Sequence, residues 1–172
     1  EQVLPKGSEI VTVRGREGEK PLQRYTAGSC ERRFTDLPIA LLVNGGNASA
    51  SEIMAGALQA HKRAVLVGER TYGKASVQSV IKLALRPDCA VRLTTGYYYT
   101  PDGKLIHGVG IAPDVEIVVP KAEWRRVQMK RFHEKAPAGA PGCEFKANQG
   151  DADAQLERAK EVLKNQRMLN KG

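Results

Sequence analysis

Two residues of this chain, Ser49 and Lys74, have side chains that could act together in covalent chemistry. Ser49 lies in the stretch NGGNASASE (44–52), directly before a segment with helical spacing of apolar residues, and Lys74 lies in GERTYGKASVQ (68–78). The first turn of a helix has unpaired N–H groups and a partial positive charge, which stabilise a developing oxyanion. The pattern is therefore compatible with a serine nucleophile and a lysine base.

The serine also has a purely structural interpretation. Ser49 and Glu52 form the Ser-x-x-Glu pattern of a capping box, in which the serine only begins a helix. Ser51 is a competing hydroxyl, and spacing alone does not separate it from Ser49. If Ser49 is a nucleophile, the N–H of Ala50 would donate to the oxyanion, and the small neighbouring residues would let a substrate backbone approach.

A serine nucleophile needs a base, and the sequence places no histidine beside Ser49. A lysine can serve when burial lowers its pKa from about 10.4 towards 7–8. Lys74 follows an apolar stretch and is flanked by Tyr72, Gly73 and Ala75, which predicts a rigid, partly apolar loop. On its own, such a lysine is more often a solvated surface charge.

The same loop contains part of a phosphate-binding motif. Gly68, Gly73 and Lys74 match a P-loop, but Ala75 stands where that motif needs Ser or Thr, and 76–85 reads as a strand rather than a helix. The three cysteines and three histidines are dispersed and form no CxxC. We therefore expect neither a nucleotide, nor a metal, nor another cofactor.

The net charge of +8 is a feature that many nucleic-acid-binding proteins share. Aromatic residues are scarce, however, and the basic residues are scattered except in KAEWRRVQMKRFHEK (121–135), which favours a solvated helix face and no nucleic-acid partner. The longest apolar run, IALLV (39–43), is far shorter than the roughly 20 residues of a membrane-spanning helix.

The hydrophobic pattern predicts an α/β core over residues 1–118 and a helical C-terminal extension over 119–172. A buried strand, a helix and a second buried strand (37–44, 50–61 and 64–68) predict a βαβ unit with parallel pairing. Further strands are expected at 9–14, 22–26, 76–85 and 91–99. We expect helices at 121–135 and 151–169 in the extension, with a linker at 135–142 between them. Asp151 or Asp153 is expected to cap the second helix.

Taken together, the stretch LVNGGNASASEIMAGALQAHKRAVLVGERTYGKASVQSVIKL (42–83) resembles the carboxy-terminal processing, or tail-specific, proteases. These are Ser/Lys-dyad endopeptidases of the periplasm, thylakoid lumen and cell envelope. LTTGYYYTPDGKLIHGVGIAPDVEI (93–117) and DAQLERAKEVLK (153–164) extend the likeness. The resemblance implies a ClpP/crotonase-like core.

The resemblance also implies roles for four residues. Ser49 would be the nucleophile, Lys74 the general base, Gln78 the residue that orients the lysine, and Ala50 the donor of one oxyanion N–H. Gln78 would lie about 5–6 Å from Lys74 in a helical turn, but about 13 Å away in a strand. Asn47 replaces a serine that is usual in the family, which removes no catalytic group.

The function implied is that of a serine endopeptidase that cleaves unstructured C-terminal regions of proteins through an acyl-enzyme, outside the cytoplasm and without a cofactor. Its partners would be substrates with exposed C-termini. In the family, a PDZ domain and an Asp-Leu-Arg-x-Asn-x-Gly-Gly-like segment with the second oxyanion donor would precede residue 1. The alternative is a non-catalytic scaffold or interaction fragment in which Ser49 only caps a helix.

Overall fold

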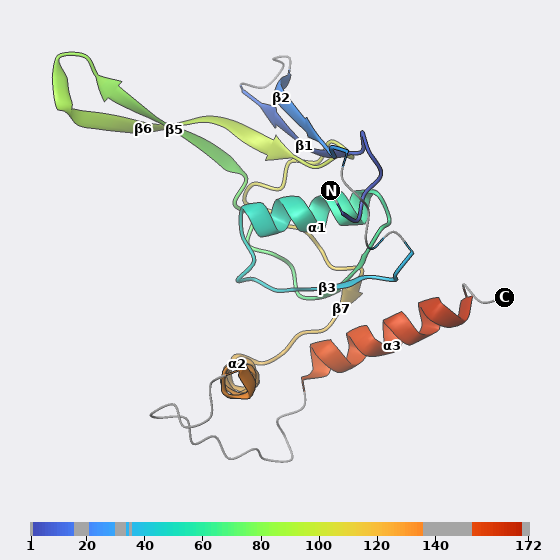
Figure 1. Cartoon of the computed structure of the whole chain (residues 1–172). Helices are drawn as coiled ribbons and strands as arrows, with labels where there is room; N and C mark the ends of the chain where they lie inside the picture. The colour runs from blue at the N-terminus through green and yellow to red at the C-terminus, as the bar shows by residue number, and fades with distance from the viewer. Residues whose placement is uncertain (1, 16–20, 30–33, 35, 136–152, 170–172) are drawn as a thin grey trace.

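The computed structural model describes residues 2–15, 21–29, 34, 36–135 and 153–169 (Figure 1). The two glycines of GREGEK (15–20) predict a turn between the first two strands. Most of this segment, nearly all of the linker at 135–142, and Asp151 lie outside the described residues. Within them the chain forms seven strands and three helices, arranged as two sheets with a helix between them.

One sheet is antiparallel and has the strand order β2-β1-β6-β5. The strands β1 and β2 form at the positions expected from the alternating pattern. Strand β6 begins earlier than expected, because its first residues pair with β5 and extend a long hairpin. The bounds are β1 (Glu9–Arg14), β2 (Pro21–Thr26), β5 (Ser76–Leu83) and β6 (Arg86–Tyr99).

The second sheet is parallel and has the order β3-β4-β7. Helix α1 connects β3 to β4, and their parallel pairing confirms the predicted βαβ unit. A third strand, β7, was not predicted, because its two residues lie in a turn-rich segment. The bounds are β3 (Ala40–Val43), α1 (Ala50–Ala60), β4 (Val65–Gly68) and β7 (Val115–Glu116).

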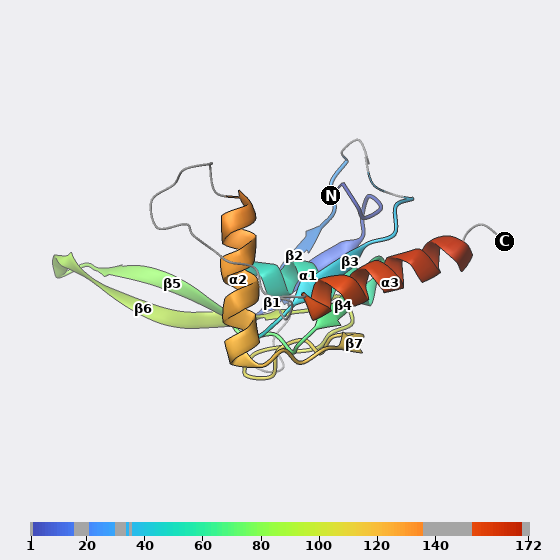
Figure 2. The same cartoon turned by 90° about the horizontal axis from the view of Figure 1, so that it is seen from below.

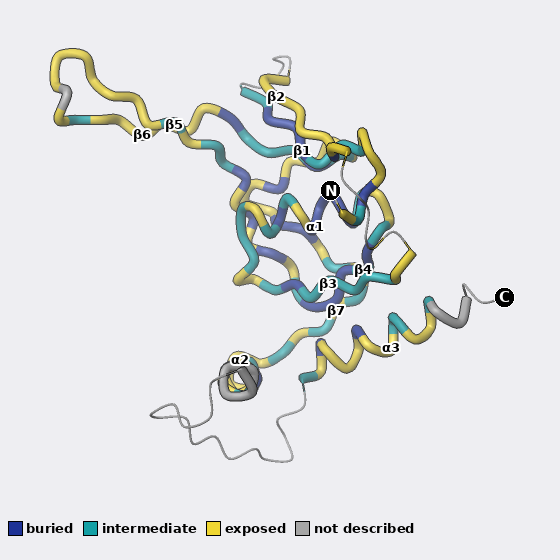
Figure 3. Tube along the Cα trace, viewed as in Figure 1, coloured by how far each residue is buried: buried dark blue, intermediate teal, exposed yellow. Residues whose placement is uncertain are grey.

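Helix α1 lies between the two sheets, as Figure 1 shows. Its apolar side chains enter two buried clusters that join it to both layers. The outer part of the β5–β6 hairpin projects away from this body and is largely exposed (Figure 3). The core therefore fixes α1 and the loop after β4, and the candidate site lies at the start of this helix and in this loop. The first cluster consists of Val43, Ala55, Leu66, Ala75, Ile106 and Ile111.

The C-terminal region forms α2 (Lys121–Lys135) and α3 (Ala154–Leu169). Figures 1 and 2 show that the axes of these helices cross steeply and that α3 lies against the parallel sheet on the side away from α1. Gln155 of α3 is buried and donates from Nε2 to the carbonyl oxygen of Ile117 at 3.2 Å. The carboxylate of Asp153 accepts the N–H of Leu156 at 3.1 Å, as expected of a helix cap. No helix among the described residues has the length and apolarity to cross a membrane.

Candidate active site

Ser49 is the residue that precedes helix α1, and its backbone has an unusual conformation. Its φ is 57° and its ψ is −117°, a combination that glycine adopts easily and serine does not. Such a conformation costs about 1–3 kcal/mol and persists only where the surrounding structure imposes it. A residue that served only as a helix cap would be expected to have an ordinary extended backbone.

The hydroxyl groups of Ser49 and Ser51 differ in their contacts. Ser51 Oγ donates to the carbonyl oxygen of Ala48 at 2.8 Å. Ser49 and Glu52 form the predicted capping box: the Ser49 side chain faces the Glu52 amide, and the Glu52 carboxylate accepts the Ser49 N–H. The Glu52 amide also donates to the Ser49 carbonyl oxygen at 2.9 Å, and the hydroxyl makes no separate cap hydrogen bond. Ser49 is therefore the more available nucleophile of the two.

The carboxylate of Glu52 lies at the centre of the site and is fully buried. Its Oε1 accepts hydrogen bonds from the Thr71 hydroxyl at 2.5 Å and the Gly73 N–H at 2.6 Å. Its Oε2 accepts the N–H of Lys74 at 2.8 Å and the N–H of Ser49 at 3.0 Å. One side chain thus joins the backbones of both candidate catalytic residues. The sequence pattern predicts for Glu52 only a place in a capping box, because its other donors lie about 20 positions away in the chain.

Backbone contacts on both sides hold the loop that carries Lys74. The Tyr72 N–H donates to the carbonyl oxygen of Asn47 at 2.9 Å, in the segment that leads to Ser49. The carbonyl oxygen of Gly73 accepts the N–H of Gly108 at 2.9 Å. Gly73 has a φ of +89°, and a Cβ there would lie 2.8 Å from the backbone nitrogen of Gly110. The loop is therefore closely packed, as its sequence led us to expect.

The side chains of Lys74 and Gln78 are both exposed. Across the described part of the chain, no hydrogen bond joins either of them to the other or to Ser49. Gln78 lies in β5, so an extended backbone separates it from Lys74, and a register shift between Val77 and Gln78 bends the strand there. The same β5 replaces the helix that a P-loop would need after Lys74.

Ala50, the expected oxyanion donor, is the first residue of α1 and is exposed. Its N–H has no hydrogen-bond partner among the residues that the structure describes. An N–H at this position points out of the helix and can donate to an external oxygen.

The fold brings His107 to the site, which the sequence did not indicate. Its Nδ1 accepts the N–H of Ala75, the residue after Lys74, at the long hydrogen-bond distance of 3.4 Å. Its ring lies 4.8 Å from the ring of Tyr97 between centroids. No sequence pattern joins these residues, because the contact depends on the loop between β6 and β7. His107 is consequently a further titratable group near the candidate site, besides Lys74 and Glu52.

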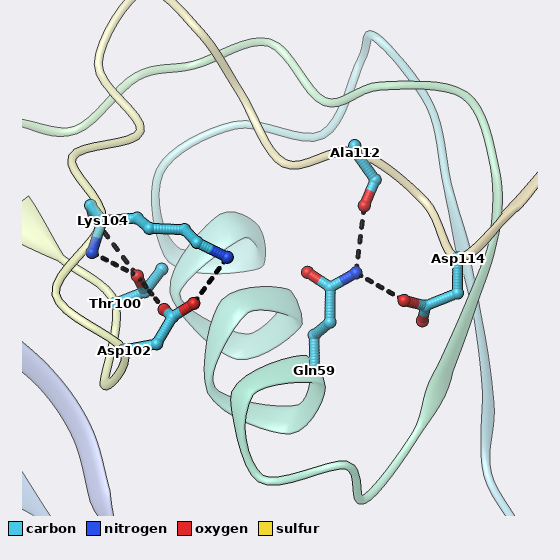
Figure 4. Close-up of polar contacts among 6 residues, drawn as sticks. All are labelled: Gln59, Thr100, Asp102, Lys104, Ala112 and Asp114. Carbon is cyan, nitrogen blue, oxygen red and sulfur yellow. Dashed lines mark hydrogen bonds and ion pairs between the residues drawn. The ribbon is translucent and has the colours of Figure 1, made fainter.

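A cavity of about 670 Å³ lies beside the second half of α1 and is also lined by residues of the segment 100–114. Figure 4 shows its polar contacts: Gln59 Nε2 donates to the Ala112 carbonyl oxygen at 3.0 Å and to Asp114 Oδ1 at 2.8 Å, and Lys104 pairs with Asp102 at 2.7 Å. Burial raises the pKa of Asp102, but hydrogen bonds from Lys104 and Thr100 outweigh it and hold that pKa below its usual value. Neither Ser49 nor Lys74 lines this cavity.

Acidic, cysteine and histidine side chains in the described residues do not form any group of three that could hold a metal ion.

Comparison with known proteins assigns the chain to a family of peptidases. The family model described as peptidase family S41 matches residues 1–117. A carboxy-terminal-processing protease of Bartonella bacilliformis is 48% identical over 124 residues, which cover 70% of this chain and 26% of that protein. The chloroplastic carboxyl-terminal-processing peptidase 1 of Arabidopsis thaliana is 42% identical over 111 residues, covering 64% of this chain and 22% of that protein.

Among solved structures, a photosystem II D1 C-terminal processing protease matches with a TM-score of 0.61 and 34% identity. The match covers 68% of this chain and 29% of that protein. The chain thus spans about a quarter of the length of these relatives.

Proposed function

Because the chain belongs to peptidase family S41, we propose that it carries the Ser49–Lys74 dyad of a serine endopeptidase on a ClpP/crotonase-like core. Its substrates are C-terminal regions of proteins, as the names of its relatives suggest, and we propose, in keeping with the resemblance noted above, that these regions are unstructured. We place its action outside the cytoplasm, in the periplasm or cell envelope, in keeping with the resemblance noted above. The reaction uses no metal or other cofactor.

In this proposal, neutral Lys74 takes the proton of the Ser49 hydroxyl as Oγ attacks the carbonyl carbon of the scissile bond. The oxyanion that forms accepts the N–H of Ala50. Lys74 returns the proton to the leaving amine, the C–N bond breaks, and the acyl group stays on Ser49 as an ester. Lys74 then takes a proton from water as the water oxygen attacks the ester carbon, and it returns that proton to Ser49 Oγ as the ester C–O bond breaks and the acid product leaves. Gln78 orients the lysine.

One observation carries the proposal: the buried Glu52 carboxylate accepts the backbone N–H groups of both Ser49 and Lys74. A helix cap alone gives no reason to connect Ser49 with a loop 20 or more positions later. The strained backbone of Ser49 supports the same interpretation, since strain of this kind is concentrated at functional sites.

A lysine base has to be shielded from water to be neutral near neutral pH, and the side chain of Lys74 is exposed in this chain. We propose that the Lys74 side chain is covered by the bound substrate or by additional polypeptide, of the kind that makes up the other three quarters of the relatives' length. A second oxyanion donor would come from the same additional polypeptide, and losing one such donor costs about 10²–10³ in rate.

The test is cleavage of an unstructured fluorogenic peptide with an apolar C-terminus. It compares this chain with a longer protein that supplies the additional length of the relatives, and with Ser49→Ala and Lys74→Ala in that longer protein. We expect activity in the longer protein and none in either variant. Cleavage by Ser49→Ala at the parent rate would instead favour the scaffold alternative, in which Ser49 only caps α1.

A further inference from the structure

We infer that the cavity beside the second half of α1 binds a carboxylate on a short aliphatic chain, and that the bound anion raises peptide cleavage. The first half of this inference concerns binding alone, and the second half rests on the proposed function. The cavity volume of about 670 Å³ lies within the ~300–1,000 Å³ of sites that hold small molecules.

Two basic side chains of the cavity are available to pair with a ligand. Lys62 and Arg70 both line it, and within the described residues neither side chain has a hydrogen bond or an ion pair. The other charged groups already have partners. Asp102 pairs with Lys104 at 2.7 Å (Figure 4), and Asp114 accepts a side-chain amide from α1 and a backbone N–H, each at 2.8 Å. An ammonium and a guanidinium without partners suit a carboxylate ligand.

The balance of charge in the cavity favours a single negative charge on the ligand. Three cations and two carboxylates line it, which leaves one net positive charge. A phosphate monoester carries about 1.5–2 negative charges at neutral pH and would be repelled by the two carboxylates. An uncharged ligand would leave both available cations without a partner. We therefore expect a carboxylate rather than a phosphate or an alcohol.

The apolar part of the lining suits a hydrocarbon chain. Ile106 and Ile111 line the cavity and are buried, whereas Leu105 and Val109 also line it and are 42% and 58% exposed. A hydrocarbon in the cavity would cover part of this exposed aliphatic surface, which is favourable in water. Each CH₂ group of the ligand that is buried should strengthen binding about two- to fourfold.

The cavity is connected to the candidate active site through Thr71. This residue follows Arg70, and its hydroxyl accepts the N–H of Ile111, which also lines the cavity, at 2.8 Å. The same hydroxyl donates to Oε1 of Glu52 at 2.5 Å, and Glu52 accepts the N–H groups of both candidate catalytic residues. A ligand that pairs with Arg70 and covers Ile111 restrains both neighbours of Thr71. It should therefore increase the share of molecules in which the loop with the proposed base is correctly placed.

The binding experiment titrates the longer protein of the cleavage test with octanoate in a calorimeter. We expect saturable binding at one site, binding of hexanoate that is about 4–16-fold weaker, and binding of octanol that is about tenfold weaker or more. Arg70→Gln should weaken octanoate binding about tenfold or more, because a charge-assisted hydrogen bond is lost. Arg92→Gln is the matched control, since Arg92 is exposed in β6 and does not line the cavity.

Two further measurements separate a loss of binding from a loss of folding. Octanoate should raise the temperature of thermal unfolding of the parent and of Arg92→Gln, and should raise it less in Arg70→Gln. Lys62→Gln removes the other available cation and should also weaken octanoate binding, so the assignment does not depend on one variant.

The same chemistry, a carboxylate beside an aliphatic chain, occurs in a free fatty acid and at the C-terminus of a peptide. A short peptide that ends in Leu, as the free acid and as the amide, is therefore compared with octanoate. Tighter binding of octanoate would assign the cavity to fatty acids. Tighter binding of the peptide acid, lost in its amide and in Arg70→Gln, would assign the cavity to peptide ends.

The cleavage experiment measures kcat/KM for the fluorogenic peptide with and without saturating octanoate. We expect octanoate to raise kcat/KM about fivefold or more in the parent and in Arg92→Gln, but not in Arg70→Gln.

Binding of octanoate that does not saturate, or that is equally tight in Arg70→Gln and Lys62→Gln, would overturn the binding site. Saturable binding with unchanged or lowered cleavage would overturn the connection through Thr71. Cleavage by Ser49→Ala at the parent rate would overturn the proposed function, and the titration would still decide whether the cavity binds the anion.

Discussion

Ser49 and Lys74 donate their backbone N–H groups to the same oxygen atom, Oε2 of Glu52, at distances of 3.0 and 2.8 Å. The start of α1 and the loop after β4 are therefore joined through one carboxylate, and this connection does not depend on the side chains of Ser49 and Lys74. Because Glu52 is fully buried, water cannot replace these hydrogen bonds when one is lost.

Replacing Glu52 by glutamine should disrupt this connection. The amide NH₂ of Glu52→Gln would face N–H and O–H donors where an oxygen now accepts them. We expect the free energy of unfolding to fall by about 2 kcal/mol or more, and kcat/KM to fall with it. Urea unfolding and peptide cleavage measure the two effects. Glu116→Gln, an exposed carboxylate, is the control. Parent-like stability in Glu52→Gln would show that the four contacts carry little free energy.

The left-handed backbone of Ser49 predicts a difference between two inactive variants. Ser49→Gly relieves the strain that Ser49→Ala retains, so the glycine variant should be about 1 kcal/mol more stable than the alanine variant and no less stable than the parent. Thermal unfolding of this chain gives the comparison. Equal stability of the two variants would contradict a strained backbone at this position.

The identity of the base can be tested with Lys74→Met and His107→Gln. A lysine accepts a proton only when neutral, so kcat/KM should rise with pH through the lowered pKa of a shielded lysine, whereas a histidine base would reach its plateau at lower pH. We expect Lys74→Met to abolish cleavage and His107→Gln to keep this rise. Loss of activity in His107→Gln alone would instead identify His107 as the base.

Gly73 should not tolerate a side chain. Its φ of +89° disfavours alanine, and the new Cβ would lie 2.8 Å from the nitrogen of Gly110. We expect Gly73→Ala to lower the free energy of unfolding by about 1–3 kcal/mol and to lower cleavage by moving Lys74. Gly103→Ala is a matched control, since Gly103 also has a positive φ but no atom within 4 Å of its added Cβ. Equal losses in both variants would mean that the contact with Gly110 has no effect.

Asp102 should contribute to the pH dependence of stability. Because its pKa is lowered in the folded state, the folded chain binds fewer protons than the unfolded chain in acid. The contribution is present above the unfolded pKa of about 3.9 and is lost as the pH falls through the folded value. Thermal unfolding between about pH 7 and pH 3 should show a smaller acid loss in Asp102→Asn. The effect should weaken in about 0.5 M salt, since the pair with Lys104 is largely exposed. A parent-like acid loss in Asp102→Asn would contradict this.

The sequence predicted the elements whose signal is local. The βαβ unit around α1 follows from two short apolar runs and a helical repeat between them. Strand β7 was missed because its pairing depends on the distant strand β4. The first part of β6 was missed because Arg86–Asp88 contains a proline, although it pairs with the neighbouring strand β5. The role of Glu52 and the position of His107 were missed because they depend on distant contacts: Thr71 is 19 positions from Glu52, and Ala75 is 32 positions from His107.

The β5–β6 hairpin has a consequence for the colloidal behaviour of the chain. Ile81 and Val91 are paired across the strands, and with Leu83 and Leu93 they leave one aliphatic face in water. The net charge of +8 keeps copies of the chain apart at low ionic strength. Added salt screens that repulsion but strengthens contacts between aliphatic surfaces. We therefore expect the solubility of the chain to fall as salt is added, with no change in its folding.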